Sequence, residues 1–135
     1  MAGLCLLARP LAAEAQPAAE VSASDPMVRV AIEAPEGCGS RVVFDRELER
    51  LLGDARFSGA PLVGRARISA LGGAFRLELG LDQGGATSTR AVEGASCTTL
   101  LETAALLVAI AHDPSAVVER RAAAPEPSAP PEPAP

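Results

Sequence analysis

Apolar and polar positions follow two different periods in the middle of the chain. Val28, Val30 and Ile32 alternate with polar or small residues, and this period of two predicts a half-buried strand that ends before Pro35. Further along, apolar residues recur every three or four positions, which predicts an amphipathic helix with a charged opposite face. These residues are Phe44, Leu48, Leu51, Leu52 and Ala55.

The pair Gly72-Gly73 is a signal for a two-residue hairpin turn. With this turn, apolar residues face apolar residues across the hairpin: Ala70 faces Phe75, Ile68 faces Leu77, and Ala66 faces Leu79. On the other face, Arg67 meets Glu78. A shift by one residue would destroy every match, so the register of this hairpin is well specified.

A second turn is predicted at residues 83–85, and its length decides where Arg90 lies. A two-residue turn at Gly84-Gly85 would place Arg90 opposite Leu79 on the buried face. A three-residue turn would place Arg90 beside Glu78 on the exposed face. We prefer the three-residue turn, because burial of an unpaired guanidinium is costly.

The last element runs from about Cys97 to His112 and is apolar nearly all round, which is typical of a largely buried helix. Ser96 and a capping box beginning at Thr99 are alternative starts, and Pro114 is expected to end it. The predicted order is therefore β-α-β-β-β-α. The fold class is α+β, a two-layer sandwich with both helices on one face of a four-stranded, mostly antiparallel sheet, within residues 27–114.

The two ends differ from this middle in composition. Residues 1–15 are expected to be a truncated signal segment, with a short apolar run and a small-x-small cleavage pattern at 13–15. The absence of a basic n-region and the Arg9-Pro10 interruption leave a disordered leader as the alternative. Leu4 before Cys5 does not fit a lipoprotein signal. Residues 16–26 are a flexible leader and 115–135 a Pro/Ala-rich disordered tail or linker, and no apolar run reaches a membrane-spanning length.

Charge and composition exclude several classes of function. The 135 residues hold 12 basic side chains, all of them Arg, against 17 acidic ones, for a net charge of −5. A Walker loop is excluded because its lysine is missing. The acidic balance and the scarcity of aromatic residues argue against nucleic-acid binding.

Catalytic and metal-binding constellations are also missing from the pattern. The only His is His112, and fifteen helical residues separate it from Cys97, which is about 22 Å at 1.5 Å per residue. We therefore expect no nucleophile-base dyad, no zinc site, no cofactor and no enzymatic activity. The polar feature that remains is a candidate binding surface on the exposed sheet face, formed by Arg65, Arg67, Arg76 and Arg90.

Two cysteines lie at or just before the starts of the two helices. If the helices begin at the same end of the sheet, Cys38 and Cys97 can meet at the separation that a disulfide requires. The alternatives are two buried thiols, or a reactive thiolate at a helix N-terminus. We predict the disulfide.

Residues 34–40, 92–97 and 112–114, which include Cys38 and Cys97, resemble parts of uncharacterised cell-envelope proteins of high-GC bacteria such as the myxobacteria. The resemblance covers residues 28–135. It implies a two-cysteine α+β domain with an Ala/Pro-rich linker, often before further envelope domains, and it transfers no catalytic residue. Whether the chain is complete is left open.

From these features we expect a periplasmic or secreted, non-enzymatic interaction or scaffold domain. It would engage an envelope protein, or a downstream domain, through its Pro-rich arm. The alternative is a small-ligand or anion-binding module that uses the Arg-bearing sheet face.

Overall fold

The computed structural model describes residues 26–39, 41–125 and 133. The expected signal segment at 1–15, Cys5 and nearly all of the expected leader at 16–26 lie outside the described residues, as does most of the chain beyond residue 125.

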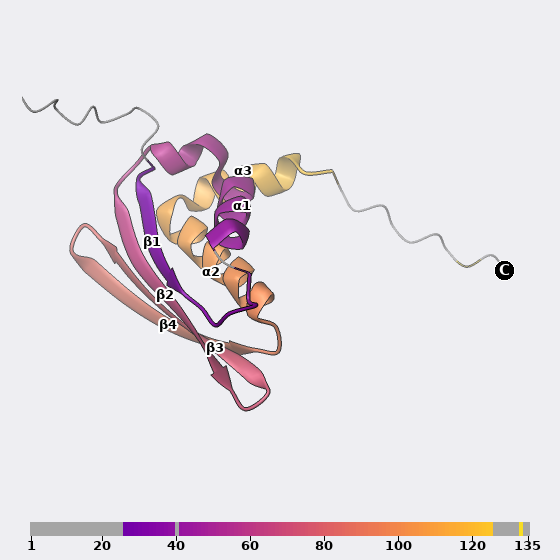
Figure 1. The fold of residues 1–135 in the computed structure, drawn as a ribbon. Coiled ribbons are helices and arrows are strands. Elements are labelled where there is room, and N and C mark those ends of the chain that lie inside the picture. The colour runs from indigo at the N-terminus through magenta and orange to yellow at the C-terminus, as the bar shows by residue number, and fades with distance from the viewer. Residues whose placement is uncertain (1–25, 40, 126–132, 134–135) are drawn as a thin grey trace, which may run out of the picture.

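The described chain forms a mixed four-stranded sheet with helices packed against it (Figure 1). The strands are β1 (Val28–Glu33), β2 (Leu62–Leu71), β3 (Ala74–Gln83) and β4 (Ala86–Gly94). The helices are α1 (Arg41–Leu52), α2 (Cys97–His112) and α3 (Pro114–Ala123), and a short 3-10 helix, η1 (Gly53–Phe57), follows α1. The sheet order is β1-β2-β3-β4, with β1 parallel to β2 and the other neighbours antiparallel. The predicted α+β class is confirmed.

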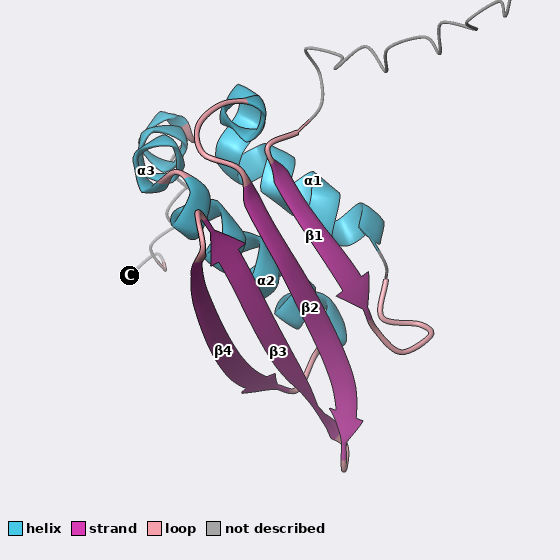
Figure 2. Ribbon diagram, turned by 90° about the vertical axis from the view of Figure 1, so that its left-hand side faces the viewer, coloured by secondary structure: helices cyan, strands magenta, loops and turns pink. Residues whose placement is uncertain are grey.

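The core lies between the sheet and the helices, which lie behind the strands in Figure 2. Leu62 and Leu77 of the sheet and Leu101 of α2 are completely buried. None of the buried side chains in the described part of the chain is polar or charged. Apolar burial is therefore the main force that holds the two layers together.

The first hairpin has the predicted register. Ala66 faces Leu79 and Arg67 faces Glu78. Gly72 and Gly73 have φ values of 48° and 83°, which is the left-handed region that a tight hairpin turn requires and that glycine adopts without strain.

The second hairpin differs from the prediction. Gln83 pairs with Ala86, so the turn has two residues, and Arg90 lies opposite Leu79. The preference for a three-residue turn was wrong because it assumed that this face of β4 is buried. β4 is an edge strand, and Arg90 is exposed there, so the guanidinium keeps its contact with water.

The segment expected to begin a disordered tail starts with helix α3. The Asp113 carboxylate accepts a hydrogen bond from the Ala116 amide at 3.0 Å, and Pro114 occupies the first turn. Proline stops a preceding helix but is favourable at the start of the next one, and the sequence analysis used only the first property. Val117 is buried in the core, which docks α3 on the domain.

No single helix of the described chain is long and apolar enough to cross a membrane. Together α2 and α3 meet that length and composition requirement, but they are bent by 118° where they join.

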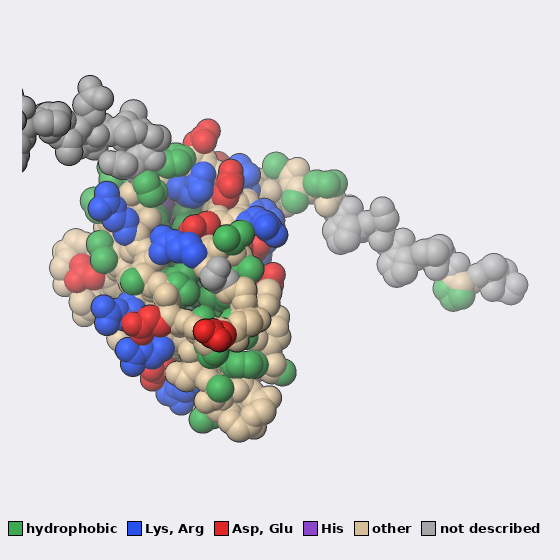
Figure 3. Space-filling model, in the orientation of Figure 1, with side chains coloured by type: hydrophobic (Ala, Val, Ile, Leu, Met, Phe, Trp, Pro, Cys, Tyr) green, Lys and Arg blue, Asp and Glu red, His purple; other side chains and the backbone are tan. Residues whose placement is uncertain are grey.

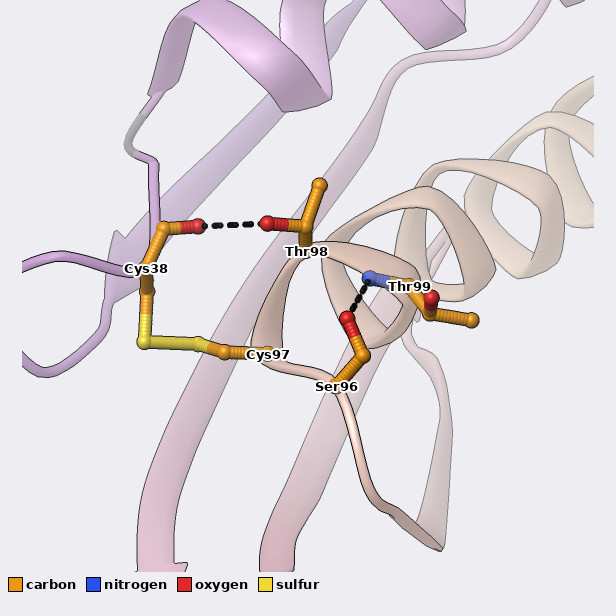
Figure 4. The surroundings of a disulfide bond; sticks show 5 residues. All are labelled: Cys38, Ser96, Cys97, Thr98 and Thr99. Carbon is orange, nitrogen blue, oxygen red and sulfur yellow. Dashed lines mark hydrogen bonds between the residues drawn. A yellow bond between two sulfur atoms is a disulfide. The ribbon is translucent and has the colours of Figure 1, made fainter.

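A disulfide joins Cys38, in the loop before α1, to Cys97 at the start of α2 (Figure 4). The two Cα atoms are 5.2 Å apart. Beside the bond, the Thr98 hydroxyl donates to the Cys38 carbonyl at 3.3 Å. Ser96 caps α2, because its hydroxyl accepts a hydrogen bond from the Thr99 amide. The beginnings of the two helices are thus linked by covalent and polar contacts.

Candidate binding surface on the sheet

The outer face of the sheet carries interleaved charges of both signs. Strand alternation places Arg65 and Arg67 there, with acidic residues on the neighbouring strands. Arg67 forms an ion pair with Glu33 at 2.9 Å, and Arg76 lies between Glu78, at 3.7 Å, and Glu93, at 3.5 Å. Figure 3 shows such blue and red side chains side by side at the lower left of the molecule. Exposed pairs of this kind contribute little to stability.

An open hollow of about 650 Å³ lies on this face, and its lining includes Arg65, Arg67 and Glu78. A second hollow of about 460 Å³ shares Arg65, Gly80 and Thr89 with the first. The two hollows therefore adjoin at these residues, and together they are called the trough. Its floor is low at Gly80, where a β-carbon would meet no atom within 4 Å.

Two of the arginines that line this hollow have no ion-pair partner within 4.0 Å among the described residues. They are Arg65, on β2, and Arg90, on β4. Both border the hollow, although the register assigns the Arg90 side chain to the helix side of the sheet. Arg65 thus gives the hollow a positive charge that the described chain leaves unmatched.

The two edges of the sheet differ. On the β1 edge, the Arg41 guanidinium from α1 donates a hydrogen bond to the Val30 carbonyl. This contact occupies part of the free edge of β1. On the β4 edge, residues 86–91 and 93 are exposed, and Val92 and Gly94 are only partly buried. Within the part of the chain that the structure describes, β4 is therefore the open edge of the sheet.

The titratable groups on the helix side are held by local contacts. His112 Nε2 lies 2.9 Å from the Ala55 carbonyl oxygen. Because a carbonyl only accepts, Nε2 carries the proton and donates. The other ring nitrogen, Nδ1, is buried and has no partner in the described structure. This contact fastens the end of α2 to η1.

The carboxylates of α1 are paired with arginines. Asp45 lies 3.4 Å from Arg41, and Glu49 lies 3.8 Å from Arg56. The hydrogen bond from Arg50 lowers the pKa of the Glu47 carboxyl below its usual value, and the positive charge of Arg50 acts in the same direction. Within the described residues, no group of three or more His, Cys, Asp or Glu side chains could hold a metal ion.

The structure brings together three of the four arginines that the sequence proposed as a surface. Arg65, Arg67 and Arg90 border the hollow, whereas Arg76 lies outside it, between its two glutamates. Neither the place of Gly80 in the trough nor the openness of the β4 edge was predicted from the sequence. A glycine inside a strand pattern was the available signal for the first of these.

No protein-family model matches the chain, and no curated protein matches it. Two solved structures have a related arrangement of elements. The Protein Y N-terminal domain of Thermus thermophilus is 18% identical with a TM-score of 0.45, and the match covers 64% of this chain and 93% of that one. A ribosomal subunit interface protein from Coxiella burnetii is 8% identical with a TM-score of 0.42, covering 70% of this chain and 98% of that one.

The expected extracytoplasmic function, location and partners are contradicted by these matches, which are Protein Y and a ribosomal subunit interface protein. We therefore withdraw the extracytoplasmic scaffold with its Pro-rich arm, the small-ligand or anion-binding alternative and the envelope partner. The exclusion of nucleic acid is withdrawn as well. The physical reason is that the composition of the two ends of the chain does not by itself specify a compartment or a partner. The resemblance to two-cysteine domains of high-GC bacteria stays a prediction.

Proposed function

We propose that this domain is a non-enzymatic binding module that docks on another macromolecule through the outer face of its sheet. The observation that carries the proposal is the trough across β2, β3 and β4, bordered on the outer face by Arg65, which has no ion-pair partner in the described structure. The predicted sandwich has both helices on the opposite face, so among the described residues this face is open to a partner.

The shape of the trough favours a large partner over a small molecule. Small-molecule sites are concave, mostly apolar and enclose most of their ligand. Here the hollow is open, and its lining includes charged residues of both signs together with small residues such as Gly80 and Ala91. An open surface of this kind, in which charged side chains border apolar area, is typical of the contact regions of macromolecular complexes.

The groups that would support catalysis are engaged elsewhere. Cys38 and Cys97 are joined to each other, and the proton on His112 Nε2 is directed at a main-chain carbonyl. The Asp45 and Glu49 carboxylates lie beside arginines on an exposed helix face. None of these groups faces the trough, which supports binding as the role of the domain.

Filling the trough tests the proposal. Gly80→Trp places a large side chain over open space without a steric conflict at its β-carbon. Gly80→Ala is the matched small control, and Ser69→Trp places the same indole on the outer face outside the lining of the trough. Macromolecules captured from the source cells by the immobilised protein are quantified for each variant. Association with purified ribosomal particles is measured by sedimentation for the same variants. One of the similar solved structures is that of a ribosomal subunit interface protein, which is why this partner is included.

We expect Gly80→Trp to lose a partner that Gly80→Ala and Ser69→Trp retain. Equal capture by all variants, with each shown to be folded by circular dichroism, would contradict the outer face as the binding surface. Loss of partner in both Trp variants would point to a nonspecific effect of the indole and would also contradict it.

A further inference from the structure

The open edge of the sheet offers main-chain groups in a regular pattern. Gly84 and Gly85 form a two-residue turn with positive φ values, and such a turn closes on the hydrogen-bonded pair of Gln83 and Ala86. Hydrogen-bonded and non-hydrogen-bonded pairs alternate from that point along an antiparallel ladder. The N–H and C=O groups that point away from β3 therefore belong to Thr87, Thr89, Ala91 and Glu93.

The one charge on β4 that lacks an ion pair in the described structure is Arg90. Glu93 already contacts Arg76, whereas Arg90 is exposed on the helix side of the strand, between Ser88 and Val92. The main-chain groups of Arg90 point towards β3. A strand added antiparallel to β4 would thus meet Arg90 in a non-hydrogen-bonded pair, the type in which opposite side chains lie closest.

We propose that β4 accepts an extended segment of a partner protein, which adds a fifth strand to the sheet and places an acidic side chain opposite Arg90. This inference rests on the proposed function and names the kind of partner. Main-chain hydrogen bonds to the four outward residues hold the segment, and the acid matches the unpaired charge. In the added segment, the residues two positions before and two positions after the acid lie opposite Val92 and Ser88. Apolar or β-branched side chains fit at these two positions.

A second copy of this chain does not supply that complement. In antiparallel pairing of β4 with itself, residues that face each other lie on the same side of the sheet. The residues of β4 on the side of Arg90 are Ala86, Ser88, Val92 and Gly94. None is acidic, so each register leaves Arg90 unmatched or opposite itself. An unpaired charge on an edge strand opposes self-association and selects a partner of opposite charge.

A seven-residue peptide tests the inference on the full chain. The peptide Lys-Ile-Thr-Glu-Thr-Val-Thr, acetylated and amidated, aligns its Glu with Arg90 and its Lys with Glu93 in antiparallel pairing. Binding is followed through amide chemical shifts. The control peptide has Lys in place of the central Glu, and a second control carries N-methyl groups on the amides that would point at β4.

We expect shifts centred on β4, affinity about tenfold lower for the Lys control and no binding of the N-methylated peptide. Arg90→Glu should reverse the preference between the Glu and Lys peptides, and Arg29→Glu, which makes the same charge change on β1, should not. Thr89→Pro removes one outward amide and should abolish binding, whereas Thr89→Ala should preserve it.

Equal binding of the Glu and Lys peptides, or shifts confined to another element, would overturn the inference. A dimer in sedimentation that Thr89→Pro dissociates would overturn it in favour of a second copy. A cellular partner lost with Gly80→Trp but retained with Thr89→Pro would leave the proposed function standing and remove only the edge-strand mode.

Discussion

The disulfide closes a long loop in a small domain, and its removal should have a large effect. Cys38 and Cys97 are 59 positions apart, and the chain-entropy model gives a stabilisation of about 4 kcal/mol at 25 °C for a loop of that length. A domain of this size has a total free energy of unfolding of about 5–15 kcal/mol. Reduction should therefore remove a large part of the stability without removing any atom from the core.

Urea denaturation followed by circular dichroism measures this loss. We expect the midpoint to fall by roughly 2 M on reduction, for a slope near 2 kcal/mol/M. The experiment uses Cys5→Ser as background, so that the third cysteine takes no part in thiol exchange. The variant with both Cys38→Ala and Cys97→Ala should lose slightly more, because both sulfurs are buried and their removal also leaves space in the core.

A change of less than about 1 kcal/mol on complete reduction would refute this reasoning. It would mean that the unfolded chain is already restricted to a similar extent, or that packing around the two helix starts holds them together without the bond. Intact mass after alkylation, with and without reductant, establishes the state of the thiols in each sample.

Three further changes probe the strands, a helix start and an ion pair. Gly64→Ala should destabilise the domain by about 1–3 kcal/mol in urea, because its β-carbon would stand 2.7 Å from a Leu side chain of β3, whereas Gly80→Ala should be close to neutral. Asp113→Ala should cost about 1 kcal/mol and loosen α3, measured by amide exchange, and unchanged exchange would contradict its capping role. Since Arg50 lowers the pKa of Glu47, that pair stabilises the fold above about pH 4.5 and loses its effect as pH falls below this value. The difference in unfolding free energy between the native protein and Arg50→Ala should therefore shrink on acidification, and a constant difference from pH 7 to 3 would contradict it.

Local patterns in the sequence determined most of the elements. The alternation around Val30 and the helical spacing around Leu48 correspond to β1 and α1. Gly72-Gly73 specified the register of β2 and β3, because only one alignment matches apolar with apolar residues on one face and Arg67 with Glu78 on the other. Such features depend on neighbours in sequence, which a linear pattern records.

Tertiary structure alone decided which surfaces stay open. The placement of Arg90 depended on whether a helix covers β4, and no local pattern carries that information. The start of α3 depended on Val117 reaching the core, because capping by Asp113 is too weak to hold a ten-residue helix by itself. The contrast between the β1 edge, contacted by Arg41, and the free β4 edge arises from packing of residues distant along the chain. Exposure is a property of the assembled layers, so the candidate binding surface became visible only when the sheet and its helices were in place.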